Sequence, residues 1–177
     1  IKKLKLYTKN GVASAVRVDM GRAELRPDLI PVKLPGDSVV ARPVTVGGKE
    51  YAITCVSLGN PHCVIFCEDV DRLNLAEIGP LFENNALFPD RVNTEFVEIM
   101  DRNYLKMRVW ERGSGETLAC GTGACASAVA AVLCGHADKD TDIRVKLPGG
   151  ELTVRYNGDT VFMTGECKKV FEGVVEI

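Results

Sequence analysis

The chain has 177 residues, a formal net charge of −2 and a hydrophobic content of 46%. This length and composition are typical of a globular protein with room for one substantial core. Lysine and arginine are dispersed and no apolar run could span a bilayer, so neither a nucleic-acid partner nor a membrane is expected. Seven cysteines without a secretory signal favour reduced thiols in a cytoplasmic protein over a disulfide framework.

Alternating apolar and polar residues predict strands along most of the chain. Residues 3–8 and 12–20 flank Asn10-Gly11, and the stretch VTVGGKEYAITCVSL repeats this pattern around Gly47-Gly48. Both glycine-containing pairs are typical of tight hairpin turns. Further strands are expected in NTEFVEIM, YLKMRVWE, IRVKL, ELTVRY and TVFMTG.

Two segments predict helices. The first, DRLNLAEIGPLFEN, begins at Asp71, a residue suited to capping, and Pro80 is expected to break it. The second covers about 121–134 and includes ACASAVAAVLC, which has no polar face, with Gly135 as its stop signal. A short helix that is apolar on every side must be surrounded by protein. We therefore predict an α+β fold in which an antiparallel or mixed sheet curls, barrel-like, around this central helix.

Cys120 directly precedes the Gly-Thr-Gly step that opens the central helix. The first amides of a helix lack internal acceptors and form a seat for a carboxylate or phosphate. A thiol at this position is expected to have a lowered pKa, because the helix dipole stabilises the thiolate. The alternative is that Cys120 is only a buried core residue, as most free cysteines are.

Polar residues stand at several strand ends that lead toward a common site. Glu111 and Arg112 follow one strand, while Asn60 and His62 precede another and Asn93 begins a third. Loop–strand junctions are where polar groups converge on a ligand, although asparagine also forms turns and a lone histidine is often structural. A zinc site at His62 with Cys63 and Cys67 does not match the usual ligand spacings. A Cys–His hydrolase using Cys120 and His62 is a further alternative.

Three stretches carry a family resemblance: SLGNPHCVIF, PDRVNTEF and especially RVWERGSGETLACGTGACASAV. With LPGGELTVRY and VFMTGECKKVFEGVVEI, they closely resemble diaminopimelate epimerase over essentially the whole chain. The resemblance implies cofactor-independent, metal-free epimerisation of LL-2,6-diaminopimelate to the meso form, in lysine and peptidoglycan precursor biosynthesis. It also implies a two-cysteine acid/base mechanism and two related domains with the site between them.

The resemblance assigns roles residue by residue. Cys120 matches the second catalytic cysteine, and His62 and Glu111 match residues expected to tune its pKa. The matching substrate-binding positions are Asn60, Asn93, Glu111, Arg112, Gly121 and Thr122. The nearest enzymatic rival is a proline racemase-like isomerase of the same fold, and a rival of another class is a non-catalytic ligand-binding fragment.

The motif of the first catalytic cysteine in this family, of the type C-G-N-G, is absent from the chain. The resemblance therefore implies that residues 21–165 form the C-terminal domain, while 1–20 and 166–177 are strands that belong with a missing N-terminal domain. That domain is the expected partner, a homodimer is an alternative, and the chain alone is expected to be inactive.

Overall fold

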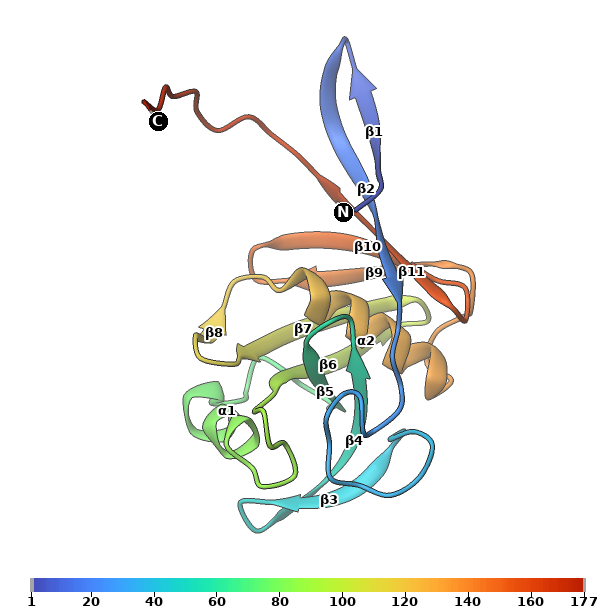
Figure 1. The fold of residues 1–177 in the computed structure, drawn as a ribbon, viewed down its shortest axis with the longest axis vertical. Coiled ribbons are helices and arrows are strands. Elements are labelled where there is room, and N and C mark those ends of the chain that lie inside the picture. Colours follow the sequence, from blue (N-terminus) through green and yellow to red (C-terminus); the bar gives the residue numbers. More distant parts are fainter. Residues whose placement is uncertain (1, 177) are drawn as a thin grey trace.

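Apart from residues 167–176, the predicted strands and helices are present in the structure, a computed structural model that describes residues 2–176. The strands are β1 (Leu4–Lys9), β2 (Val12–Arg22), β3 (Arg42–Val46), β4 (Lys49–Ser57), β5 (Pro61–Phe66), β6 (Asn93–Asp101), β7 (Tyr104–Glu111), β8 (Gly115–Thr117), β9 (Asp142–Leu147), β10 (Gly150–Tyr156) and β11 (Thr160–Glu166). The helices are α1 (Leu75–Glu83) and α2 (Gly121–Leu133). The α+β class is confirmed (Figure 1).

All strands belong to one mixed sheet, in the order β1-β2-β11-β10-β9-β7-β6-β5-β4-β3, with β8 paired to β7. The β5–β6 and β7–β9 pairs are parallel, and the other pairs are antiparallel. The predicted hairpins are confirmed: Asn10 and Gly11 have φ of 53° and 78°, and Gly47 and Gly48 have φ of 58° and 78°. Positive φ at both central residues is what a two-residue hairpin turn of the I′ type requires.

Helix α2 is the centre of the larger core. Its residues from Gly123 to Ala131 are all buried, and it contacts β4 to β7 on one side and β9 to β11 on the other. Small alanine side chains let strands approach the helix axis closely, and strands lie on both sides of α2 (Figure 1). The central apolar helix is therefore confirmed, ending at Leu133 with Gly135 at φ 80°. Within residues 2–176, β1 and β3 are the two ends of the strand order, so the barrel-like curl of the sheet around α2 stays a prediction.

A second core lies on the other face of β4, β5 and β6 and is covered by α1, with Phe82 and Phe96 packed edge-to-face at its centre. Two details of the helix prediction were wrong. The N-cap is Asn74 rather than Asp71, and Pro80 lies inside the helix without ending it. Proline removes one backbone hydrogen bond, but the burial of Leu75 and Phe82 at the two ends holds the short helix in place.

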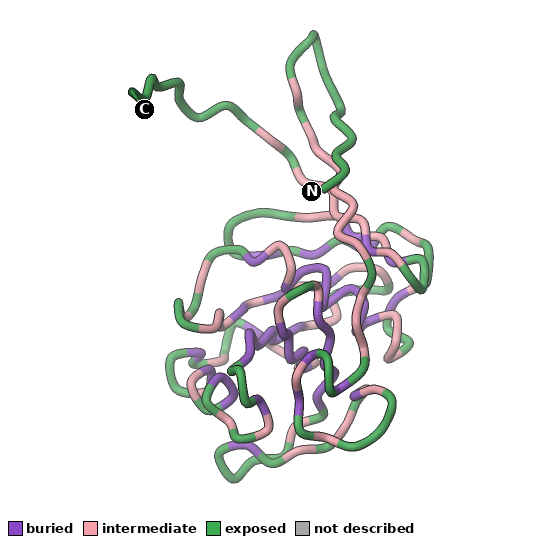
Figure 2. Tube along the Cα trace, in the orientation of Figure 1, coloured by how far each residue is buried: buried purple, intermediate pink, exposed green. Residues whose placement is uncertain are grey.

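The hairpin of β1 and β2 and the segment after β11 extend away from the two cores (Figure 1). Their exposure contrasts with the buried strands around α2 (Figure 2). Large apolar side chains are uncovered there: Leu4, Leu6, Val12, Val170, Phe171, Val174 and Val175. Residues 167–176 form no strand, so the prediction of strands at 166–177 is wrong for that range, while Ile177 lies outside the described residues. The assignment of these segments to another domain stays a prediction.

Among residues 2–176, no helix combines the length and apolar character needed to cross a membrane.

Candidate active site

Cys120 is the N-cap of α2 and has extended backbone angles, φ −135° and ψ 108°. Its Sγ accepts a hydrogen bond from the Gly123 amide at 3.3 Å, and it lies 3.5 Å from the Thr122 hydroxyl. The sulfur therefore satisfies one of the free amides of the first turn. As the first residues of α2, Gly121 and Thr122 have amides without intrahelical acceptors, and the anion seat at these amides stays a prediction.

A buried polar chain runs from β6 to this seat. Glu95 Oε1 lies 2.7 Å from His62 Nδ1, and both side chains are fully buried. His62 Nε2 lies 3.1 Å from Asn60 Oδ1, and Asn60 Nδ2 donates to Thr122 Oγ1 at 3.2 Å. The amide oxygen of Asn60 only accepts, so in this arrangement His62 Nε2 carries a proton. The structure thus joins Asn60, His62 and Thr122 to the region of Cys120 through hydrogen bonds.

Asn93 and Arg112 form a second group. Asn93 lies opposite His62 in the parallel β5–β6 register, and its Nδ2 donates to the Pro61 carbonyl at 2.8 Å. Its Oδ1 accepts from the Arg112 amide at 3.0 Å. The Arg112 guanidinium donates to the Asp90 carbonyl at 2.8 Å, and among the described residues this bond uses one of its five N–H donors. Asn93 therefore anchors the turn that carries Arg112, and it is itself buried.

Glu111 ends β7, where it pairs with Gly115 of β8, and its carboxylate accepts a short hydrogen bond from the Thr117 hydroxyl. Ala119, directly before Cys120, lines a 540 Å³ cavity between β10, β11 and the loop at 147–150. Asn60 thus contacts the start of α2 through Thr122, and the Glu111 carboxylate lies near enough to Cys120 to affect the pKa of its thiol. Asn93 and Arg112 form a separate hydrogen-bonded group where β6 begins and β7 ends.

The prediction of a lowered thiol pKa at Cys120 was wrong. Burial raises the pKa of the Cys120 thiol, and the negative charge of Glu95 raises it further, with a smaller effect in the same direction from Glu111. Hydrogen bonds from Thr122 and Gly123 lower this pKa, but they do not offset burial. The sequence indicated that Cys120 stands at the helix start, but it did not show that this residue is only 7% exposed.

The geometry conflicts with two of the alternatives, the zinc site and the Cys–His hydrolase. Adjacent residues of a strand point to opposite faces, so His62 faces α2 while Cys63 packs in the second core. These two side chains cannot ligate one zinc ion. Both ring nitrogens of His62 are within hydrogen-bond distance of Glu95 and Asn60, so the ring has no nitrogen left to act as the base of Cys120.

Glu95, Glu83 and Gly123 also support the site and were not predicted from the sequence. Glu95 sits on β6 two residues after Asn93, and the strand alternation that places both on one face was a usable signal. A Cβ added to Gly123 would lie 2.7 Å from Glu95 Oε1, so this glycine makes room for the carboxylate. Glu83, at the end of α1, carried no sequence signal because its partners are far along the chain.

Comparison with known proteins places this chain in a family. The family model for diaminopimelate epimerase matches residues 54–170. Diaminopimelate epimerase of Acetivibrio thermocellus is 51% identical over 179 residues, covering 100% of this chain and 63% of the relative. The chain belongs to the diaminopimelate epimerase family. That of Synechococcus elongatus is 55% identical over 165 residues, covering 92% of this chain and 58% of the relative. The chain thus spans about three fifths of the length of these diaminopimelate epimerases, which are isomerases by name.

Solved structures confirm the fold at low sequence identity. A probable proline racemase from Agrobacterium radiobacter has a TM-score of 0.67 at 13% identity, covering 93% of this chain and 54% of that one. The diaminopimelate epimerase family therefore shares its architecture with proteins of other names. The fold alone does not separate their substrates.

Proposed function

We propose that this protein serves in the epimerisation of LL-2,6-diaminopimelate to the meso form, with Cys120 as one of two acid/base thiols. Such a reaction would provide a precursor for lysine and peptidoglycan, and the proposal includes no metal or organic cofactor. The observation that carries the proposal is the position of Cys120 beside the free amides of Gly121 and Thr122. One turn of helix can thereby bind a carboxylate and present a sulfur to the adjacent α-carbon.

The chemistry requires proton transfer on opposite faces of that carbon. A thiolate on one side removes the α-proton and becomes a thiol, and the carbanion then takes a proton from a thiol on the other side, which becomes a thiolate. Amides at the helix start stabilise the charge that develops on the substrate carboxylate. The raised pKa of Cys120 favours its neutral thiol form, which is the proton donor. Only the minor thiolate form can remove an α-proton, so proton removal by Cys120 is expected to be slow.

The remaining residues are proposed to bind the substrate. Arg112 suits the distal carboxylate because its forked donors match two oxygens, and its turn is held by Asn93. Asn60 contacts the seat through Thr122, and Glu111 suits a substrate ammonium group. His62 is proposed to act on the thiol only indirectly, through Asn60 and Thr122, since its ring nitrogens are both engaged.

The second acid/base is proposed to come from a part of the protein outside this chain. Within residues 2–176, Cys120 is the only cysteine at the start of a helix, and the chain covers 63% of the Acetivibrio relative. The uncovered apolar side chains of β1, β2 and 167–176 are proposed to pack against that part, or in its absence against a second copy. By itself this chain is then expected to exchange the α-proton without inverting the centre.

The test is incubation of the protein with each diaminopimelate isomer in D2O, followed by mass and chirality of the product. We expect slow α-deuterium uptake with retained configuration, and its loss in Cys120→Ala. Uptake that persists in Cys120→Ala would overturn the role of this thiol. Steady inversion by this chain alone would instead show that no second thiol from elsewhere is needed. Exchange of proline rather than diaminopimelate would favour a proline racemase-like activity.

A further inference from the structure

A buried carboxylate that the proposed chemistry does not use lies at the end of α1. Glu83 is only 7% exposed, yet it is surrounded by donors from three separate segments. Its Oε2 accepts from the Trp110 indole Nε1 at 2.7 Å. Its Oε1 accepts from the Gly113 amide at 2.9 Å and from the Arg91 guanidinium at 3.0 Å. Both oxygens therefore act as acceptors, and they do so in different directions.

The Gly113 amide belongs to the tight turn that carries Arg112. The Ser114 amide donates to the Glu111 carbonyl at 3.1 Å, and Gly113 has φ of 79°, so residues 111–114 form a turn with its third position in the left-handed region. Within this turn, the Arg112 amide is held by Asn93 and the Gly113 amide by Glu83. Two consecutive backbone amides are thus fixed by two buried side chains.

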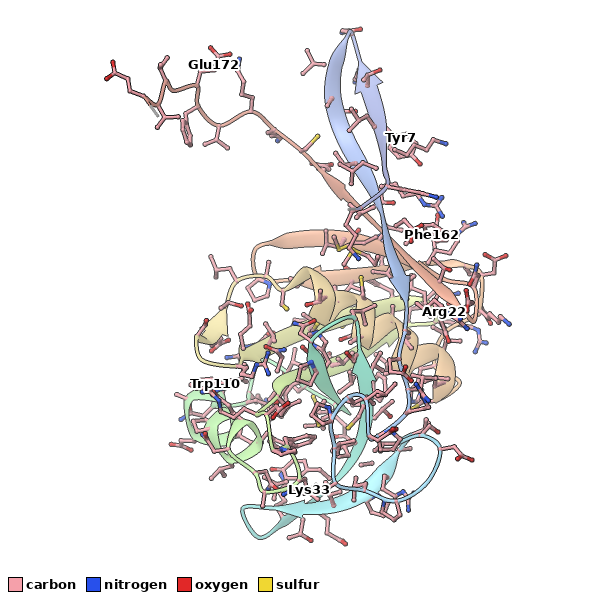
Figure 3. The ribbon with its side chains drawn as sticks, in the orientation of Figure 1. Tyr7, Arg22, Lys33, Trp110, Phe162 and Glu172 are labelled. Atoms are coloured by element: carbon pink, nitrogen blue, oxygen red, sulfur yellow. The ribbon has the colours of Figure 1, made fainter. Side chains whose placement is uncertain are left out.

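The packing of helix α1 against β7 places the Glu83 carboxylate beside Trp110 and Gly113. Gly79 lies against the Trp110 ring, where a Cβ would come within 2.3 Å of the indole carbons. This close contact brings β7 and α1 together, and Trp110 lies beside α1 in Figure 3. Burial alone raises the pKa of Glu83, but the donors from Trp110 and Gly113 and the charge of Arg91 outweigh it, so the pKa lies below its usual range. Glu83 is consequently a carboxylate, with two accepting oxygens.

We propose that Glu83 is a positioning residue that fixes the 111–114 turn against α1 and so sets the place of Arg112 in the substrate site. The proposal rests on the proposed function in assigning Arg112 to the substrate carboxylate. Its first part, the fixing of the turn, is independent of any reaction. Glu83 does not touch substrate in this scheme, and it acts only through the backbone that carries Arg112.

Glu83→Gln tests this role selectively, because it removes one accepting oxygen while it keeps the size of the side chain. A glutamine amide has one accepting oxygen, so whichever way it turns, its NH2 group must face either the indole N–H or the Gly113 N–H. At least one of these hydrogen bonds is therefore lost while size and shape are kept. Glu77→Gln is the matched control, because Glu77 is an exposed glutamate in the first turn of the same helix.

Two NMR signals report on the turn without any turnover. Trp110 is the only tryptophan of the chain, so its indole proton is a single resolved signal. We expect the Gly113 amide or the indole proton to exchange with D2O about tenfold faster in Glu83→Gln than in the unchanged protein, the size of one lost hydrogen bond. Glu77→Gln should leave both rates unchanged. Equal rates in Glu83→Gln would overturn the proposal.

A second experiment measures the diaminopimelate concentration that gives half-maximal α-deuterium uptake. Glu83→Gln should raise it about threefold to tenfold, with a smaller change in maximal rate, if misplacing Arg112 weakens one charge-assisted contact. In a protein that already carries Arg112→Ala, adding Glu83→Gln should not change the half-maximal diaminopimelate concentration further. An equal effect with and without Arg112 would refute positioning of this residue and leave a general structural role.

Failure of the two proposals can be told apart. Absence of any deuterium uptake contradicts the proposed function, while the Gly113 and indole exchange rates still decide whether Glu83 holds the turn. If Glu83→Gln does not fold, the hydrogen-exchange rates of the unchanged protein test the proposal instead. There the Gly113 amide and the indole proton must both exchange about tenfold or more slowly than in an unstructured peptide, and rapid exchange of either one refutes the proposal.

Discussion

The change Gly123→Ala tests whether the first turn of α2 is shaped by the buried carboxylate beneath it. A Cβ at this position would lie 2.7 Å from Glu95 Oε1 and 3.2 Å from both Glu95 Cγ and Cys120 Sγ. Real Cβ atoms do not approach other atoms to 2.7 Å, so Glu95 would have to move. It has little room to do so, because the same oxygen lies 2.7 Å from His62 in a fully buried pair.

The expected change in the free energy of unfolding is the balance of two effects. Overpacking a fixed core position costs up to about 3 kcal/mol, whereas alanine in place of glycine favours a helix by about 1 kcal/mol. We therefore expect Gly123→Ala to lower the free energy of unfolding by about 2 kcal/mol, or the melting temperature by about 4–8 °C for a chain of this size. Urea unfolding followed by circular dichroism measures this free energy.

Gly121→Ala is the matched control in the same turn. Its Cβ would meet only the end of the flexible Met163 side chain, at 3.2 Å from Sδ. This variant is expected to keep the stability of the unchanged protein within about 1 kcal/mol, because methionine adapts readily. A Gly123→Ala protein as stable as Gly121→Ala would refute the claim that Glu95 and Cys120 leave no space for a Cβ.

Three further predictions concern the same core and site. Gly79→Ala should destabilise the protein by about 3 kcal/mol in urea unfolding, since its Cβ would lie 2.3 Å from the Trp110 ring, and Trp110→Leu should restore part of that loss. Iodoacetamide labelling of Cys120, mapped by mass spectrometry, should have a midpoint pH above that of an ordinary thiol. It should still precede labelling of Cys125, whose pKa burial raises to about 12. Because the folded pKa of Cys120 is raised, its contribution to stability should be lost as pH rises through that value, and labelling of Cys120 at neutral pH as fast as a free thiol would contradict this. Glu95→Leu should cost about 3 kcal/mol of unfolding free energy by leaving His62 without its partner, and an unchanged urea midpoint would contradict this.

Local patterns in the sequence determined much of the fold. The Asn10-Gly11 and Gly47-Gly48 turns, the strand alternation and the all-apolar helix that starts at Gly121 are properties of short segments. Their physical basis is local, in turn conformation, strand periodicity and capping, so the sequence predicted the α+β class and the place of Cys120. The failure at Pro80 has the opposite origin, because packing of Leu75 and Phe82 overrides the local cost of proline.

Only the tertiary structure decided the electrostatics and the supports of the site. The pKa of Cys120 depends on burial and on Glu95, which lies 25 residues earlier in the chain and on another element. Glu83 meets Trp110 and Gly113 only because α1 packs against β7. Desolvation and contacts distant in sequence have no local signature. The sequence could therefore indicate which thiol stands at the helix start, but not how strongly that thiol holds its proton.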